Sequence, residues 1–149
     1  MAIAASTVPA EVNPQEGEIL RFPIVDTETI YKGDIVRVDS NGEATSTGAA
    51  GAGDMFVGVA METVDNTDDG EYIKVYTSGV FPFTKDTPAQ TDVGRLAYNG
   101  IATNQQTVLV EAGVGTGSGI IIGAVVSLDP DDSTRVLVKI QPGLTCGIA

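Results

Sequence analysis

The stretch that most constrains the fold is Phe56–Phe83, which reads FVGVAMETVDNTDDGEYIKVYTSGVFPF. Its first part, Phe56–Met61, is apolar, and its later part, Glu71–Thr77, alternates between apolar and polar residues. The acidic segment Asp65–Gly70 separates the two parts. Because period-two alternation bounded by Asp, Asn and Gly is typical of antiparallel strands, the stretch predicts a β-hairpin. Ser78–Gly79 then breaks the second strand before its apolar end, as a bulge or a bend would.

The same pattern occurs again near the C-terminus. Ile121–Ile140 aligns with Phe56–Val75 without a gap, and both segments place an Asp-rich turn in the middle. Upstream, Asn41–Thr45 matches Asn99–Thr103, but the interval between the two matches is longer in the second copy, which predicts a longer loop there. We therefore predict a duplicated four-strand unit, and a chance likeness of two short hairpins is the alternative. The first strands of the two copies are Asp34–Val38 and Arg95–Tyr98.

Three segments outside this pattern bear on the fold. Glu18–Val25 is a further candidate strand, and Pro23 places it at a sheet edge because proline cannot donate to a ladder. Thr107–Glu111 is a candidate added strand, and the sequence predicts no helix of ordinary length. Asn41-Gly42 predicts a tight hairpin turn, since type I′ turns need positive φ at both central residues.

Composition limits the chain to an ordinary single domain. With 149 residues it can bury a core, and aromatic residues make up only 5%, so we expect a core of aliphatic side chains. The 18 Gly and 7 Pro residues suit an all-β domain with many short strands. In the pair Ile35 and Val36 one side chain is expected to point outward. The predicted core residues are Ile35, Val36, Val38, Val57, Val59, Ile73, Val75, Ile122, Val125, Val136, Val138 and Ile140.

The net charge of −12 disfavours several classes of partner. An acidic surface repels phosphate backbones and anionic membrane surfaces, so we expect neither nucleic acid nor membrane as a partner. No run is long enough to span a bilayer, and Met1–Ala10 lacks the basic and apolar regions of a signal peptide. We therefore expect synthesis in a cytoplasm without a secretory step. Cys146 is the only cysteine, so no intrachain disulfide can form.

The residue types needed for common enzyme sites are scarce. The chain has no His, which excludes Ser-His and Cys-His nucleophiles and imidazole metal sites. Gly113–Gly119 lacks the Lys and Ser/Thr of a phosphate-binding loop. Paired carboxylates for glycoside hydrolysis stay open, although the chain has no Trp on which a sugar could stack. We expect no catalytic, cofactor-binding or metal-binding residues and no cofactor.

The acidic turn of the first copy resembles the start of a calcium loop. Asp65, Thr67, Asp69 and Gly70 have the spacing of its first ligands, but Tyr76 stands where a bidentate Glu would be needed. No flanking helices are predicted either. A solvated acidic turn is the preferred interpretation.

The first residues form an arm rather than a part of the β domain. Met1–Gln15 has no periodicity and contains Pro9 and Pro14. It is either a disordered tail or an arm that orders on a neighbouring subunit, and the sequence leaves both open. We predict an arm over residues 1–17, a β domain over 18–141 and a C-terminal tail over 142–149.

The motifs together resemble a known family. They are Gly33-Asp34-Ile35-Val36, Val57-Gly58-Val59-Ala60, Gly70-Glu71 with Ile73-Lys74-Val75, Ser78-Gly79-Val80-Phe81, Gly94–Tyr98, Ile122-Gly123-Ala124 and Val136–Ile140. This series is similar to that of the bacteriophage capsid cement, or head decoration, proteins, and it covers about Ile19 to Ile140. The resemblance implies a small β-barrel or β-sandwich on the outer surface of an icosahedral head, with no catalytic residues to carry over.

The resemblance also implies a partner and a location. The partner would be the major capsid protein of a phage head, and the protein would form a homotrimer or a three-fold cluster on the virion's outer capsid surface, where it stabilises the capsid. A carbohydrate-binding or adhesin-type β-sandwich is the alternative function, and a small enzyme is a third. Because an extended arm can add to an exposed sheet edge, we predict that the capsid-binding residues lie in the arm. They are Ile3, Val8, Pro9 and Val12.

Overall fold

The computed structural model describes residues 19–46, 54–99, 106–110 and 120–142, and in this part of the chain it is all-β, as predicted. The first sheet has the order β1-β7-β5-β3-β4, formed by β1 (Ile19–Pro23), β7 (Tyr72–Tyr76), β5 (Met55–Ala60), β3 (Ile35–Val38) and β4 (Ala44–Thr45). The second has the order β10-β9-β11-β12-β8, formed by β10 (Leu109–Val110), β9 (Leu96–Asn99), β11 (Ile120–Leu128), β12 (Arg135–Ile140) and β8 (Val80–Thr84). A ribbon pairs β2 (Thr29–Ile30) with β6 (Val64–Asp65), and the 3-10 turn η2 (Gln90–Asp92) is the one helical element described.

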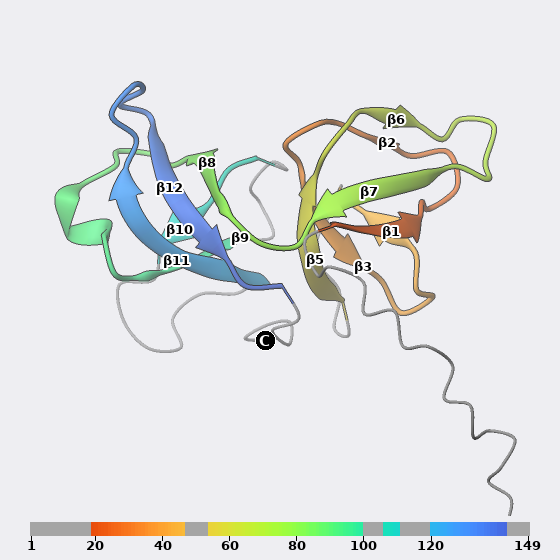
Figure 1. Ribbon diagram of the computed structural model, residues 1–149, viewed down its shortest axis with the longest axis horizontal. Coiled ribbons are helices and arrows are strands. Elements are labelled where there is room, and N and C mark those ends of the chain that lie inside the picture. The colour runs from red at the N-terminus through yellow and green to blue at the C-terminus, as the bar shows by residue number, and fades with distance from the viewer. Residues whose placement is uncertain (1–18, 47–53, 100–105, 111–119, 143–149) are drawn as a thin grey trace, which may run out of the picture.

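The two five-stranded sheets lie side by side and form two units, which we call unit 1 (residues 19–79) and unit 2 (residues 80–142) (Figure 1). Read from β8, the second sheet has the order β8-β12-β11-β9-β10, which repeats the order β1-β7-β5-β3-β4 position by position. Every pairing in these two sheets is antiparallel. The duplication is therefore present, but each unit has five strands where the sequence predicted four.

Two glycines show the equivalence of the units at atomic detail. A Cβ added to Gly58 would lie 2.2 Å from the Tyr76 backbone oxygen, and one added to Gly123 would lie 2.0 Å from the Lys139 backbone oxygen. Each glycine lies at the point where its strand shifts register against the neighbouring strand. Only glycine allows this close approach of two backbones, so the two units depend on the same device.

The structure corrects the predicted alignment downstream of these glycines. Tyr76 and Lys139 occupy equivalent places, so Val75 corresponds to Val138. The gap-free alignment put Val75 opposite Ile140 and is wrong there, because the turns between the strands differ in length. A slip by two positions keeps every side chain on its own face of the sheet, so the pattern alone could not reveal it.

The upstream alignment is corrected in the same way. Val36 pairs with Gly58 as Ala97 pairs with Gly123, so Val36 and Ala97 are equivalent. The predicted match of the two Asn-Gly sequences is therefore wrong in register, because Asn99, the last residue of β9, is the equivalent of Val38 and not of Asn41.

The segment after Ser78–Gly79 belongs to the second sheet. A bend there carries the chain from β7 to β8, which pairs with β12 and does not continue the first hairpin. The first candidate strand lies at a sheet edge as predicted, since β1 pairs only with β7. The predicted added strand is present as β10. The sheets do not close into a barrel. In each sheet, however, a single parallel bridge links the two opposite edges: Ile24 to Ala44 in the first sheet and Thr84 to Thr107 in the second.

Each unit has its own hydrophobic core, and the second core extends into unit 1. One cluster belongs to unit 1 and contains Val36, Val57, Ile73 and Val75. The other joins residues of unit 2 to three residues of unit 1, Ile35, Phe56 and Val59. All predicted core residues are buried except Val38, which is half-buried against the first cluster. Ile35 and Val36 are both buried, because they face different clusters, so the expectation that one points outward is wrong.

Candidate docking surface

The side of the second sheet that faces away from its core is apolar. Along β12, Val136, Val138 and Ile140 are buried, so the alternate residues Leu137 and Lys139 point to the opposite side. Register places Val80, Lys139, Ala124 and Leu96 in one row across four strands. We call this side of the sheet the outer face of unit 2. Its apolar residues are Val80, Pro82, Leu96, Tyr98, Leu109, Ile121, Ala124 and Leu137.

The outer face is exposed, and its described strands contribute no carboxylate to it. Val80 is 49% exposed, Leu96 42% and Leu109 38%, which are high values for side chains of this kind. Lys139 is the one charged residue within the row. Contiguous exposed apolar area of this kind is rare on monomers and is typical of interaction sites. The sequence held a signal for it, since Ile120–Val126 is apolar on both faces of its strand, which is the pattern of a strand covered on both sides.

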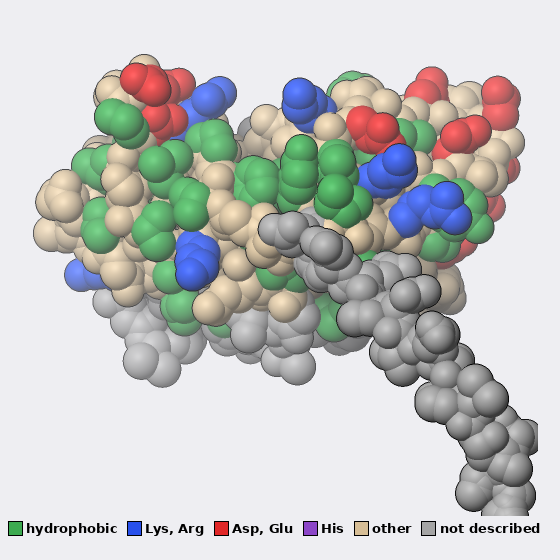
Figure 2. Space-filling view, viewed as in Figure 1, with side chains coloured by type: hydrophobic (Ala, Val, Ile, Leu, Met, Phe, Trp, Pro, Cys, Tyr) green, Lys and Arg blue, Asp and Glu red, His purple; other side chains and the backbone are tan. Residues whose placement is uncertain are grey.

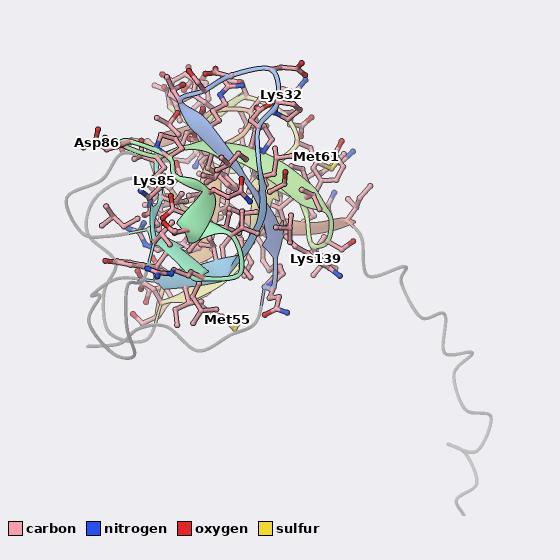
Figure 3. The ribbon with its side chains drawn as sticks, turned by 90° about the vertical axis from the view of Figure 1, so that its left-hand side faces the viewer. Lys32, Met55, Met61, Lys85, Asp86 and Lys139 are labelled. Carbon is pink, nitrogen blue, oxygen red and sulfur yellow. The ribbon has the colours of Figure 1, made fainter. Side chains whose placement is uncertain are left out.

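Acidic side chains gather elsewhere, at the turns. Figure 2 shows hydrophobic side chains spread over unit 2, while its acidic side chains collect at the end formed by the β11–β12 turn. That turn contains Asp129, Asp131 and Asp132. On a chain with a net charge of −12, a sheet face without acidic residues on its described strands is a local exception. Figure 3 shows Lys139 well apart from Lys85 and Asp86, which lie on the other side of the same unit.

Part of the equivalent face of unit 1 is buried. Ile35, Phe56 and Val59 are 4%, 0% and 3% exposed, and they pack into the core cluster of unit 2. The register of the two sheets gives their equivalents in unit 2, which are Leu96, Ile121 and Ala124, respectively. These three positions of the duplicated unit are therefore covered in unit 1, at the joint between the units, and are more open in unit 2. On the same face of unit 1, Ile19 and Tyr76 are 45% and 37% exposed.

A polar clamp accompanies this joint. The side-chain amide of Gln106 donates to Asp34 Oδ1 at 3.0 Å and to the Lys32 carbonyl at 3.3 Å. Asp34 is buried, and its other oxygen accepts from the Tyr31 N–H at 2.9 Å and the Ser46 hydroxyl at 3.0 Å. Since a buried carboxylate needs such donors, Gln106 fixes unit 2 on unit 1 at a defined position.

A groove of about 280 Å³ lies along the same joint. Its lining includes Val59, Phe81 and Phe83, together with Lys32 and Arg135. In the described part of the chain no group of three or more His, Cys, Asp or Glu residues could hold a metal ion. The groove therefore lies on the seam between the two units, and apolar side chains and two cations share its lining.

In the acidic turns, carboxylates accept hydrogen bonds from residues of the same turn. The Thr67 hydroxyl and N–H both donate to Asp65 Oδ1, and these bonds hold the pKa of Asp65 below its usual value. The Thr134 hydroxyl, at 2.6 Å, and its N–H, at 2.9 Å, do the same for Asp132 and lower its pKa. Hydrogen bonds to the charged form favour that form. Both carboxylates therefore serve to shape turns that connect strands.

The predicted capsid-binding residues, Ile3, Val8, Pro9 and Val12, lie outside the described residues. The sequence did not predict the outer face of unit 2 as a docking surface, because only the tertiary packing decides which sheet faces cover each other. No helix in the described ranges is long and apolar enough to cross a membrane.

Comparison with known proteins agrees with the resemblance. A family model described as "Phage cement protein" matches residues 14–140, which is most of the 149-residue chain. The comparisons with curated proteins and with solved structures gave no match. The chain belongs to the phage cement protein family.

Proposed function

We propose that this protein binds the outer surface of an icosahedral phage head and stabilises the capsid, with the major capsid protein as its partner. Membership of the cement family supports a structural role in association with a phage capsid. The observation that carries the proposal is the apolar outer face of unit 2, with Val80 and Leu96 nearly half exposed. An exposed face of this kind becomes buried when the protein assembles on a lattice.

The anchor to the head is the arm, Met1–Gln15. Ile3, Val8, Pro9 and Val12 supply apolar side chains on a segment that can add in extended form to a sheet edge of the capsid protein. Ordering the arm costs conformational entropy, which limits the affinity of one copy. Three copies clustered at a three-fold position, as a homotrimer, would bind with a higher effective concentration.

The test is saturable binding to purified expanded heads that lack the protein. Occupancy is measured by gel densitometry and cryo-microscopy, with the full chain and with a variant lacking Met1–Gln15. We expect a fixed copy number of the full chain per head and raised resistance of the head to heating. The truncated variant is expected to bind more weakly, while its melting temperature in free solution stays unchanged.

Two outcomes would contradict parts of the proposal. Binding that never saturates, or heads whose stability is unchanged at full occupancy, would contradict the cement function. Full occupancy by the truncated variant would remove the arm as the anchor and leave the function intact. Because melting is measured on the same variants, misfolding is distinguished from lost binding.

A further inference from the structure

We propose that one face of unit 1 binds an acidic segment of the major capsid protein through a pair of cations. The face is formed by outward-pointing residues of β1 and β7, and we call it the tyrosine–cation face. Its members are Ile19, Arg21, Tyr72, Lys74 and Tyr76. The inference rests on the proposed function for the source of the partner. It adds the chemistry of the contact and the side of unit 1 that faces the head.

Strand alternation places these side chains on one side of the first sheet. Along β7, Ile73 and Val75 are fully buried, so the residues that alternate with them point the other way. On β1, Leu20 and Phe22 pack against the core cluster of unit 1, so Arg21 between them points outward. The two strands are neighbours in the sheet, and their outward side chains therefore form one continuous surface.

Two cations oppose each other at the centre of this face. Register pairs Arg21 directly with Lys74. Like charges in directly opposite positions on neighbouring strands destabilise a sheet. Neither strand contains a carboxylate, and neither cation forms an ion pair with a carboxylate in the described part of the chain. On a chain with 20 acidic and 8 basic residues, such a pair of cations points to a counter-charge on a partner.

Arg21 is held in a position that suits a carboxylate. Its guanidinium carbon lies 4.7 Å from the centre of the Tyr72 ring. A guanidinium that lies over an aromatic ring keeps the N–H groups at its edge available for two parallel hydrogen bonds to a carboxylate. Lys74 adds a second positive charge directly beside it. The two cations together therefore favour a carboxylate over a neutral polar group.

Apolar and aromatic surface surrounds the two cations. Ile19, Tyr72 and Tyr76 are all exposed. Tyr and Arg are enriched among the residues that dominate the binding energy of protein interfaces. Figure 2 shows basic side chains beside hydrophobic ones over this part of unit 1, while most of the acidic side chains in this view of the unit lie toward its outer end. The face therefore fits a protein segment that carries carboxylates next to apolar side chains.

The phosphate groups of nucleic acid are the competing anion. The net charge of −12 repels a long polyanion, because such a partner meets the field of the whole molecule. A short acidic segment meets mainly the local charge of the two cations. Carboxylates on the surface of a capsid protein are therefore the favoured counter-charge.

The position of the arm places this face toward the head. β1 begins at Ile19, so the arm joins the β domain at the edge of the tyrosine–cation face. An arm that anchors the protein, as proposed above, brings the surface at its base close to the head. The tyrosine–cation face is thus the part of unit 1 that the anchor holds against the capsid protein.

The main experiment reverses one charge of the pair. In Lys74→Glu the new carboxylate faces Arg21, so an attraction replaces a repulsion, and we expect a melting temperature in free solution at or above that of the unchanged chain. We expect the affinity for purified expanded heads to fall by about tenfold or more, because the capsid carboxylates then meet a like charge. A lower affinity without a lower melting temperature distinguishes a lost contact from lost folding.

The matched control is Lys32→Glu. It makes the same change in net charge at an exposed residue that lies outside the tyrosine–cation face. We expect it to bind heads as the unchanged chain does. The comparison separates the effect of the local charge at Lys74 from that of the total charge of the protein.

A zero-length cross-link identifies the group that Lys74 contacts. A carbodiimide joins a lysine amine to a carboxylate as an amide, and it takes up the water that is lost and leaves as a urea. On decorated heads we expect a cross-linked peptide pair that joins Lys74 to an Asp or Glu of the major capsid protein. Lys74→Arg keeps the charge but has no amine, so it is expected to bind heads more tightly than Lys74→Glu and to lose this cross-link.

The outcomes separate this inference from the proposed function. Equal affinity of Lys74→Glu and the unchanged chain for heads would overturn the inference and leave the cement function standing. So would decorated heads on which Lys74 is cross-linked only to another copy of this chain or to no carboxylate. Binding of a labelled single-stranded DNA that Lys74→Glu abolishes would replace the acidic segment with nucleic acid and also overturn it. Failure of the unchanged chain to bind heads would contradict the cement function, and this inference with it.

Discussion

At the scale of the residue, the fold depends on two glycines where backbones approach closely. Gly58 and Gly123 sit at the register shifts of β5 and β11, where a Cβ would meet a backbone oxygen closer than any real contact. Such a clash cannot be relieved by a side-chain rotation, since the atom in the way is part of the main chain. The bulges aim Phe56 and Ile121 at the face that the two units use differently.

We expect Gly58→Ala and Gly123→Ala each to lower the free energy of unfolding by about 2–3 kcal/mol, because the sheet must shift to admit a methyl group. Gly42→Ala is the control. Gly42 also has a positive φ, of 78°, but nothing lies within 4 Å of its Cβ position. It should cost about 1 kcal/mol from backbone strain alone. Urea unfolding measures all three, and equal losses at the three sites would contradict the steric explanation.

At the scale of the element, equivalent strands bury equivalent residues. Val75 on β7 and Val138 on β12 are both fully buried, although they belong to different clusters. The strands around them alternate strictly, so the buried residues could be predicted from the period of the pattern. The exact register could not, because the turns that set it differ in length between the copies.

Truncation of Val75 or Val138 to Ala is expected to cost about 1–3 kcal/mol each, from lost burial and the cavity left behind. Val126→Ala deletes the same two methyl groups at a site that is 44% exposed and should change stability by about 0.5 kcal/mol or less. Chemical unfolding at one protein concentration compares the three. Unchanged stability at both buried sites would show that the faces are assigned wrongly.

At the scale of the whole molecule, the joint makes unit 2 dependent on unit 1. Ile35, Phe56 and Val59 complete the core of unit 2, and Gln106 returns a hydrogen bond to Asp34. The two units therefore share buried side chains and a buried carboxylate. The molecule is expected to unfold as one cooperative body.

Phe56→Ala tests this coupling. We expect a loss of about 3–5 kcal/mol, because a fully buried aromatic side chain is removed from the joint. Amide hydrogen exchange should rise in β11 and β12 of unit 2 as well as in β5, which carries the substitution. Faster exchange confined to unit 1 would show that the two units are stable independently.

The sequence by itself determined the fold class, the duplication and the edge position of β1, and it placed all but one of its predicted core residues correctly, because these follow from local periodicity and from proline and glycine chemistry. It missed other core residues, among them the fully buried Phe56 and Phe83. It also carried the family resemblance, through short motifs centred on Gly58 and Gly123. Tertiary structure decided the transfer of Val80–Thr84 to the second sheet and the burial of both Ile35 and Val36. It also decided which copy of the repeated face is covered. A period-two pattern assigns successive side chains to the two opposite faces of a strand. Only the packing of the sheets decides what lies against each face.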